Sequence, residues 1–291
     1  MTGSSRTQLI LQALEEASSQ NPDLSTFYTF HRALFRTLAQ ARTEISGALE
    51  IADKEARQAR LLQGQPLLPF AALPVEAERF AELVLDVARI LSEYDPELAQ
   101  QALPDGPAEC LALARQRFEE GQAGGERDEP QSEATLAQAS VGLALKPYLE
   151  WAAEQVLPYV DQERWKRGYC PVCGGAPDFA TLDAEVGARH LVCSRCSSEW
   201  LYRRLGCPFC STTDHAKLMY YPSEDGVYRL YVCQVCRRYL KTVDLREITR
   251  SVLLPVERIT TVAMDLAARQ EEFGKVQCSD SDSGSRWSVI S

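Results

Sequence analysis

The sequence reads Cys-Pro-Val-Cys at 170–173, Cys-Ser-Arg-Cys at 193–196, Cys-Pro-Phe-Cys at 207–210 and Cys-Gln-Val-Cys at 233–236. Two residues between cysteines allow both thiolates to reach one ion, and such a turn points backbone N–H groups at the sulfurs. These motifs hold eight of the 10 cysteines of the chain. The pattern predicts metal ligation, and the candidate ligands are Cys170, Cys173, Cys193, Cys196, Cys207, Cys210, Cys233 and Cys236.

Two motifs brought together by a hairpin supply four sulfurs, which is the ligand set of a closed structural site. The pairing is either sequential, first motif with second and third with fourth, or cross-braced. An internal repeat favours sequential pairing, because residues 189–196 resemble residues 229–236. Tetrahedral sulfur ligation suits both zinc and a single iron ion, so the residues leave the metal open.

Short β-type runs separated by turn residues surround the motifs. They cover residues 178–182, 189–192, 199–204, 218–221, 227–232 and 239–243. We therefore expect two tandem modules of the rubredoxin-like or zinc-ribbon type, at 168–205 and 206–250. Modules this small bury little surface, and metal binding contributes on the order of 10 kcal/mol to their folding.

The chain before the cysteine region has a helical pattern. Apolar residues such as Phe27, Phe30 and Leu34 recur at helical spacing, and Pro74 precedes another apolar stripe with acids in its first turn. The predicted fold class is α+β. An all-α domain (1–163) precedes the tandem four-cysteine modules (164–250), a C-terminal helix (251–273) and a polar tail (274–291) that we expect to be disordered.

Composition limits the function classes. The 291 residues carry a formal net charge of −10, which argues against phosphate-tracking nucleic-acid binding by the whole molecule. Residues 164–250 alone hold 14 Lys and Arg against 9 Asp and Glu, a formal +5. No run is long and apolar enough for a membrane span or a signal peptide, so we expect a cytoplasmic protein. A reducing cytoplasm favours metal ligation over disulfides.

The sequence contains no catalytic motif. It has no Gly-rich phosphate loop, nucleophile elbow or zincin helix, and a site of four cysteines normally leaves no open coordination position. We therefore predict no catalytic residues, and we predict that the chain is not an enzyme. We expect Cys110 in a helical core, His31 in a structural position, and His190 and His215 outside the metal sites.

The cysteine region resembles the formate dehydrogenase accessory protein family, the FdhE type. The residues that carry the resemblance are Cys170-Pro-x-Cys-Gly174, Leu191-x-Cys193-Ser-x-Cys196, Glu199-Trp200-x-Tyr202-x-Arg204 and Cys233-x-x-Cys236 followed by Tyr239-Leu240-Lys241. A closing helix over 257–269 is also similar, so the match covers about residues 168–270. Departures are Ser197 and Arg237, which stand where a glycine would follow the second motif of each module.

The resemblance implies a cytoplasmic accessory protein without known enzymatic activity. Such a protein acts on the catalytic subunit of a respiratory formate dehydrogenase and carries two rubredoxin-like sites, with iron as the associated metal. We place candidate partner contacts at Trp200, Arg203 and Arg204, which lie between the two modules and are expected to be exposed. The alternatives are an electron-transfer or thiol-redox protein and a zinc-ribbon nucleic-acid-binding protein.

Overall fold

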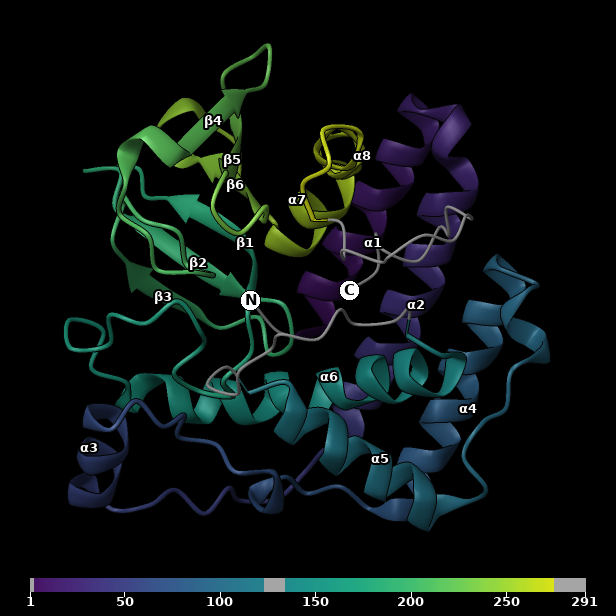
Figure 1. Cartoon of the computed structure of the whole chain (residues 1–291). Coiled ribbons are helices and arrows are strands. Elements are labelled where there is room, and N and C mark those ends of the chain that lie inside the picture. The colour runs from purple at the N-terminus through teal and green to yellow at the C-terminus, as the bar shows by residue number, and fades with distance from the viewer. Residues whose placement is uncertain (1–2, 123–133, 275–291) are drawn as a thin grey trace.

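The computed structural model describes residues 3–122 and 134–274 (Figure 1). Its N-terminal part is helical, its central part is a β-sheet, and two short helices follow. The N-terminal helices are α1 (Gly3–Gln20), α2 (Ser25–Glu44), α3 (Lys54–Leu62), α4 (Ala77–Tyr94), α5 (Pro107–Glu120) and α6 (Leu136–Val156). No helix within the described residues is long and apolar enough to cross a membrane.

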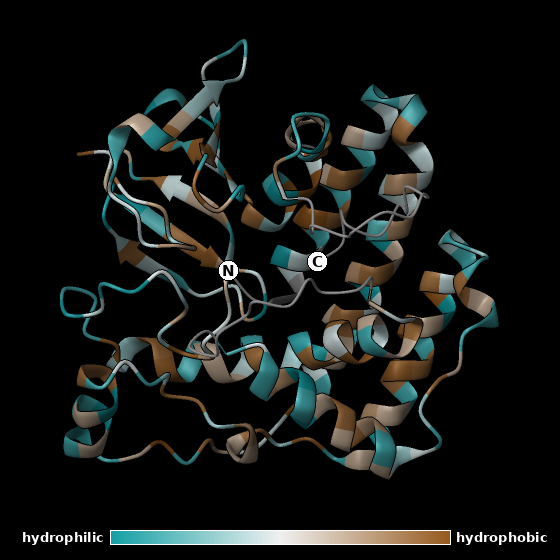
Figure 2. Ribbon diagram, viewed as in Figure 1, coloured by the Kyte–Doolittle hydropathy of each residue, from teal (hydrophilic) through white to brown (hydrophobic). Residues whose placement is uncertain are grey.

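Helices α4 and α6 form the centre of the helical part. On α4, Phe80, Val84, Val87 and Leu91 are spaced three or four residues apart and are fully buried. Helix α6 begins with a capping box: Thr135 accepts the Gln138 N–H, and the Gln138 side chain accepts the Thr135 N–H. Figure 2 shows strongly hydrophobic residues alternating with hydrophilic ones along these helices. This alternation is the expected pattern of one buried face.

Helix α3 was absent from the sequence-based expectations. It begins after Asp53, whose carboxylate accepts the backbone N–H of Ala56 at 2.8 Å. None of its side chains is buried, so it lacks the apolar stripe on which the other helices were predicted. Its N-cap aspartate was the available sequence signal.

The six strands form one sheet in the order β3-β2-β1-β6-β5-β4. They lie at or near the predicted positions: β1 (Pro177–Leu182), β2 (Arg189–Cys193), β3 (Glu199–Tyr202), β4 (Leu218–Pro222), β5 (Tyr228–Cys233) and β6 (Tyr239–Asp244). Neighbouring strands within each module are antiparallel, whereas β1 and β6 pair in parallel and join the two modules. The modules therefore share a single sheet.

The two edge strands of the sheet, β3 and β4, are protected from further strand pairing in different ways. At the β3 edge, the side chain of Gln162 accepts the Leu201 N–H at 3.1 Å and donates to the Glu199 carbonyl at 3.5 Å. At the β4 edge, the strand is five residues long and ends at Pro222, which has no backbone N–H. Short strands and prolines are common means of closing a sheet edge.

The predicted C-terminal helix is split into α7 (Leu254–Thr260) and α8 (Val262–Gln270). Thr261 lies between them with φ −86° and ψ 20°, and its hydroxyl donates to the Glu257 carbonyl at 2.7 Å. Both helices lie between the sheet and α1 (Figure 1). Helix α8 is fixed to the sheet because the ammonium of Lys241 on β6 donates to the Asp265 carboxylate at 2.6 Å.

The architecture confirms the predicted fold class of a helical domain, tandem four-cysteine modules in a sheet and C-terminal helices. We retain the division 1–163, 164–250 and 251–273 as a proposal. The predicted tail at 274–291 lies outside the described residues except for Gly274.

Candidate metal centres

The eight motif cysteines form two clusters. Cys170, Cys173, Cys193 and Cys196 make the first cluster, and Cys207, Cys210, Cys233 and Cys236 make the second. Within each cluster all sulfur atoms lie within 4.8 Å of one another. The grouping is sequential, as the internal repeat predicts, because each module folds its own two motifs together.

The four Cys-x-x-Cys motifs fold into the same turn. In the first, the Gly174 N–H donates to the Cys170 carbonyl at 2.9 Å, and the Cys170 N–H donates to the Gly175 carbonyl at 2.8 Å. The same two bonds recur in the other three motifs. The residue after each second cysteine is left-handed, with φ between 54° and 78°, at Gly174, Ser197, Ser211 and Arg237. Ser197 and Arg237 therefore depart from the glycine pattern without changing the turn.

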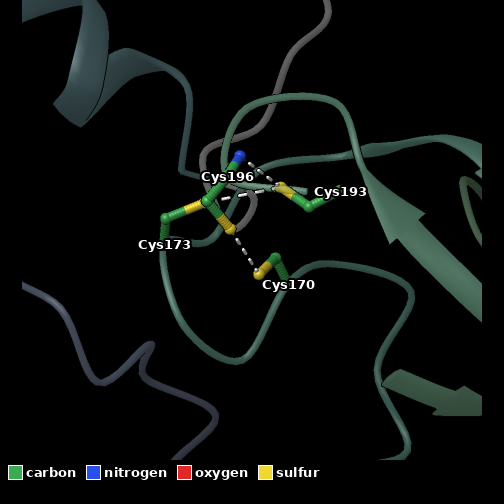
Figure 3. A group of neighbouring side chains, drawn as sticks. All are labelled: Cys170, Cys173, Cys193 and Cys196. Atoms are coloured by element: carbon green, nitrogen blue, oxygen red, sulfur yellow. Dashed lines mark hydrogen bonds between the residues drawn. The ribbon is translucent and has the colours of Figure 1, made fainter. Parts of the chain in front are cut away.

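The sulfur positions fit a tetrahedral ion. In the first cluster, drawn in Figure 3, neighbouring sulfurs are 3.4–3.5 Å apart. In the second cluster, neighbouring sulfurs are 3.6 Å apart. A metal–sulfur bond of about 2.3 Å gives tetrahedral edges of about 3.8 Å, whereas a disulfide needs about 2.0 Å. The donor set therefore suits zinc or a single iron, and either ion would cross-link its module at four points.

The helical part covers the first cluster. The N–H groups of Leu67 and Leu68 donate to the carbonyls of Pro171 and Val172, both at 2.9 Å. All four sulfur-bearing residues are at most 2 % exposed. The first motif is thus held between its own hairpin and a segment of the helical domain.

Positive side chains surround the first cluster. The Arg258 guanidinium of α7 pairs with Asp178 of β1 and lies 3.4 Å from the carbonyls of Cys193 and Ser194. Burial, and secondarily Arg258, lowers the pKa of the Lys146 ammonium on α6. The Arg258 guanidinium is placed to offset part of the negative charge that four thiolates would bring.

The two thiols of the first motif have pKa values shifted in opposite directions. Hydrogen bonds from Cys170, Cys193 and Cys196 lower the pKa of Cys173, and Arg195 contributes in the same direction. Burial raises the pKa of Cys170. Backbone N–H groups of Arg195 and Cys196 point at the Cys193 sulfur at 3.4 and 3.5 Å, as the motif spacing predicts.

The second cluster lies nearer the surface. Cys207 and Cys233 are buried, whereas Cys210 and Cys236 are partly exposed. A hydrogen bond with Cys236, helped by nearby backbone N–H groups, lowers the pKa of Cys207 to about 5 despite its burial. This side of the sheet therefore offers solvent access to two of its four candidate ligands.

A buried arginine that the sequence reasoning missed holds the two modules together. Arg189 of β2 donates to the carbonyls of Arg203 at 2.5 Å and Gly206 at 2.6 Å, on the segment that leads into the third motif. Its guanidinium also lies over the rings of Tyr202 and Tyr231, one from each module. The available sequence signal was the internal repeat, in which Arg189 corresponds to Arg229.

The predicted partner contacts have different environments. Trp200 is 0 % exposed, and its indole N–H donates to the Arg167 carbonyl at 3.0 Å, so the expectation that it is exposed is wrong. A large apolar ring on β3 packs inward because that face of the sheet meets the protein core. Arg203 and Arg204 are exposed, and Arg203 donates to the carbonyl of Ser211 at 3.2 Å.

The remaining candidates occupy structural or peripheral positions. Cys110 is 3 % exposed within the helical core, as expected. His190 lies on β2 and His215 lies on an exposed turn, and neither belongs to a cysteine cluster.

These features define a class of protein in which a helical domain is joined to a tandem four-cysteine sheet. Residues 169–204 match the family described as FdhE, central domain. That segment contains the whole first cluster. The resemblance to the FdhE family that the cysteine motifs predict is confirmed.

Among curated proteins, an FdhE homolog of Aquifex aeolicus is 37 % identical over 138 residues, covering 46 % of this chain and 47 % of that protein. An FdhE homolog of Pseudomonas aeruginosa is 29 % identical over 119 residues, covering 38 % of each chain. The chain thus aligns with less than half the length of these relatives. The crystal structure of the FdhE protein from Pseudomonas aeruginosa has a TM-score of 0.54 at 22 % identity, covering 93 % of this chain and 92 % of that one, which shows a common fold.

Proposed function

We propose that this chain is a cytoplasmic accessory protein that binds the catalytic subunit of a respiratory formate dehydrogenase and helps it become active. The observation that carries the proposal is the position of the family match. Residues 169–204 align with the FdhE central domain and contain Cys170, Cys173, Cys193 and Cys196. The role is one of binding and assembly rather than catalysis, because four-cysteine sites normally have no open coordination position.

The eight motif cysteines are proposed as ligands of two metal ions. The resemblance favours iron, and zinc is the alternative with the same geometry. The ions would hold each module together and fix the segment between the modules, residues 203–206, relative to the sheet. Arg203 and Arg204 are exposed on that segment and are proposed as contacts for the dehydrogenase subunit.

A genetic test addresses the accessory role. Deletion of the gene should lower formate dehydrogenase activity in cells grown on formate, and the wild-type chain should restore it. Cys173→Ser should fail to restore activity, because it removes a sulfur from the first cluster. Cys110→Ser is the matched control, since Cys110 is buried but lies outside both clusters. Unchanged dehydrogenase activity in the deletion strain would rule out the proposal.

A binding test addresses the partner. The purified full chain should retain the purified catalytic subunit in a pull-down, and the double variant R203E/R204E should retain less of it. Glu185 is exposed on the turn between β1 and β2, so Glu185→Arg provides a charge-reversal control of the opposite sign elsewhere on the sheet. Equal retention by wild type and R203E/R204E would move the contact surface away from residues 203–204.

Metal analysis of protein purified without oxygen identifies the ions. Two ions per chain are expected. Iron with a reversible visible absorbance would favour the electron-transfer alternative as an added role, whereas colourless zinc protein would remove it.

A further inference from the structure

The two cysteine clusters have different surroundings although their turns are the same. In the first, Cys170, Cys173 and Cys193 are 0 % exposed and Cys196 is 2 % exposed. In the second, Cys210 and Cys236 are partly exposed. A chelator or thiol reagent must reach a sulfur to displace an ion or react, so accessibility sets the order of attack.

The covers over the clusters also differ in origin. The first cluster is sealed by segments distant in sequence: residues 67–68 bond to the first motif, and Arg258 bonds to the second. On the second cluster, the Gln234 N–H of the fourth motif donates to the Lys217 carbonyl at 2.9 Å, and Arg237 donates to the Glu271 carbonyl at 2.8 Å. The sulfurs of the first cluster become accessible only when the sheet separates from the helical domain, whereas Cys210 and Cys236 are already partly exposed.

A guanidinium lies beside each cluster. Arg258 bonds to the carbonyls of Cys193 and Ser194 in the first, and Arg189 bonds to the carbonyl of Gly206, next to Cys207, in the second. Buried cations stabilise a site that carries four thiolates around a divalent ion, which has a net charge of −2. Positive charge therefore supports both ions, and the closed cover is what distinguishes the first cluster.

We propose that the first cluster is a permanent structural site and that the second is an exchangeable metal site, open to thiophilic divalent ions and to thiol reagents. This inference rests on the proposed role of the eight cysteines as metal ligands. It assigns exchange of the ion to one cluster and structural support to the other.

The test uses the full chain carrying Cys278→Ser, which removes a cysteine outside the motifs. The protein is loaded with two Zn²⁺ per chain and challenged with the chromogenic chelator 4-(2-pyridylazo)resorcinol. Zinc should leave in two phases of equal size, with the first at least about tenfold faster than the second, because local opening precedes domain separation. Release of both ions in a single phase would overturn the inference and leave the accessory function intact.

Alkylation identifies the cluster that opens first. Iodoacetamide added during the fast phase, followed by peptide mapping, should modify Cys207, Cys210, Cys233 and Cys236 before the other motif cysteines. This measurement needs no cluster variant, so it does not depend on a variant that folds poorly. Earlier modification of Cys170 or Cys173 would contradict the assignment.

A pair of arginine variants tests the cover of the first cluster. Arg258→Ala should accelerate only the slow phase, by about ten- to a hundredfold, as expected when an outer support of a metal site is lost. Arg250→Ala is the matched control, because Arg250 also pairs with a carboxylate, Glu257 on α7, but does not contact a cysteine motif. If Arg258→Ala instead accelerates the fast phase, Arg258 supports the cluster that exchanges its ion, and the proposed assignment is wrong. A chain that binds neither zinc nor iron would overturn both this inference and the proposed metal role.

Discussion

His31 lies on α2 with its imidazole ring against two aromatic rings. The ring centroids of Phe27 and Phe30 lie 4.4 and 5.0 Å away, and the buried Nε2 atom has no hydrogen-bond partner among the described residues. Burial, with smaller contributions from Lys146 and Lys241, lowers the pKa of His31 from 6.5 to about 3. The folded protein therefore keeps this histidine neutral across a range in which the unfolded chain protonates it.

This difference predicts an acid-dependent loss of stability. Between pH 6.5 and about 3 the unfolded state binds the extra proton, so the free energy of unfolding falls as pH falls, by up to about 1.4 kcal/mol per pH unit. Above pH 6.5 the effect is absent. His31→Gln should show a shallower decline in urea unfolding measured from pH 7 to 4. Parallel profiles for wild type and variant would show that His31 does not titrate in this way.

At the residue scale, the sequence predicted the cysteine ligands better than the residues that pack around them. The cysteine spacing was sufficient because two intervening residues constrain one local turn. Arg189 and Arg258 were missed because their roles depend on carbonyls far away in the chain. The burial of Trp200 was missed for the same reason, since it depends on which face of β3 meets the core.

At the scale of elements, the turn after each second cysteine is left-handed whatever residue occupies it. At Gly174 the helical domain leaves little room for a side chain. A Cβ atom added there would lie 2.9 Å from Pro66 and 3.2 Å from the Gln122 backbone. The left-handed turn favours glycine at this position, and the close contact with Pro66 requires it.

Substitution can separate these two requirements. Gly226 also has a left-handed φ, 73°, but an added Cβ would meet nothing within 4 Å. Gly226→Ala should lower the free energy of unfolding by about 1 kcal/mol, from conformation alone. Gly174→Ala should lower it by about 2 to 4 kcal/mol, because crowding is added. Equal losses in chemical denaturation would mean that the domain contact adjusts without cost.

The positions of the strands were predictable because alternating apolar residues and turn residues bound each one. Their arrangement was harder to predict. The parallel pairing of β1 with β6 joins strands about 60 residues apart and has no local signal. Helix α3 was missed because it is only nine residues long and mostly charged or polar. The break at Thr261 was missed because Ile259, Val262 and Leu266 continue at helical spacing across it.

At the scale of the whole molecule, charge is distributed unevenly. Residues 164–250 carry a formal +5, whereas the complete chain carries −10. The acidic excess therefore belongs to the helical domain and the termini. Buried ion pairs such as Lys241–Asp265 fix the C-terminal helices to the basic sheet.

This ion pair can be tested with a double-mutant cycle. Lys241→Met should cost about 3 kcal/mol or more, because it leaves the Asp265 carboxylate buried without its cation. The double variant K241M/D265L should recover most of that loss, since no unpaired charge remains. Free energies from urea unfolding measure each corner of the cycle. A double variant whose loss equals the sum of the single losses would show that the two side chains do not interact.

The finished edges of the sheet have a further consequence. The modules follow one another head to tail, so the outer strand of either module has the geometry to accept another copy, and such an arrangement has no natural end. The Gln162 side chain bonds to the backbone of β3 at one edge of the sheet, and Pro222 lacks a backbone N–H on β4 at the other. These two residues therefore hinder the addition of a further strand at either edge of the sheet.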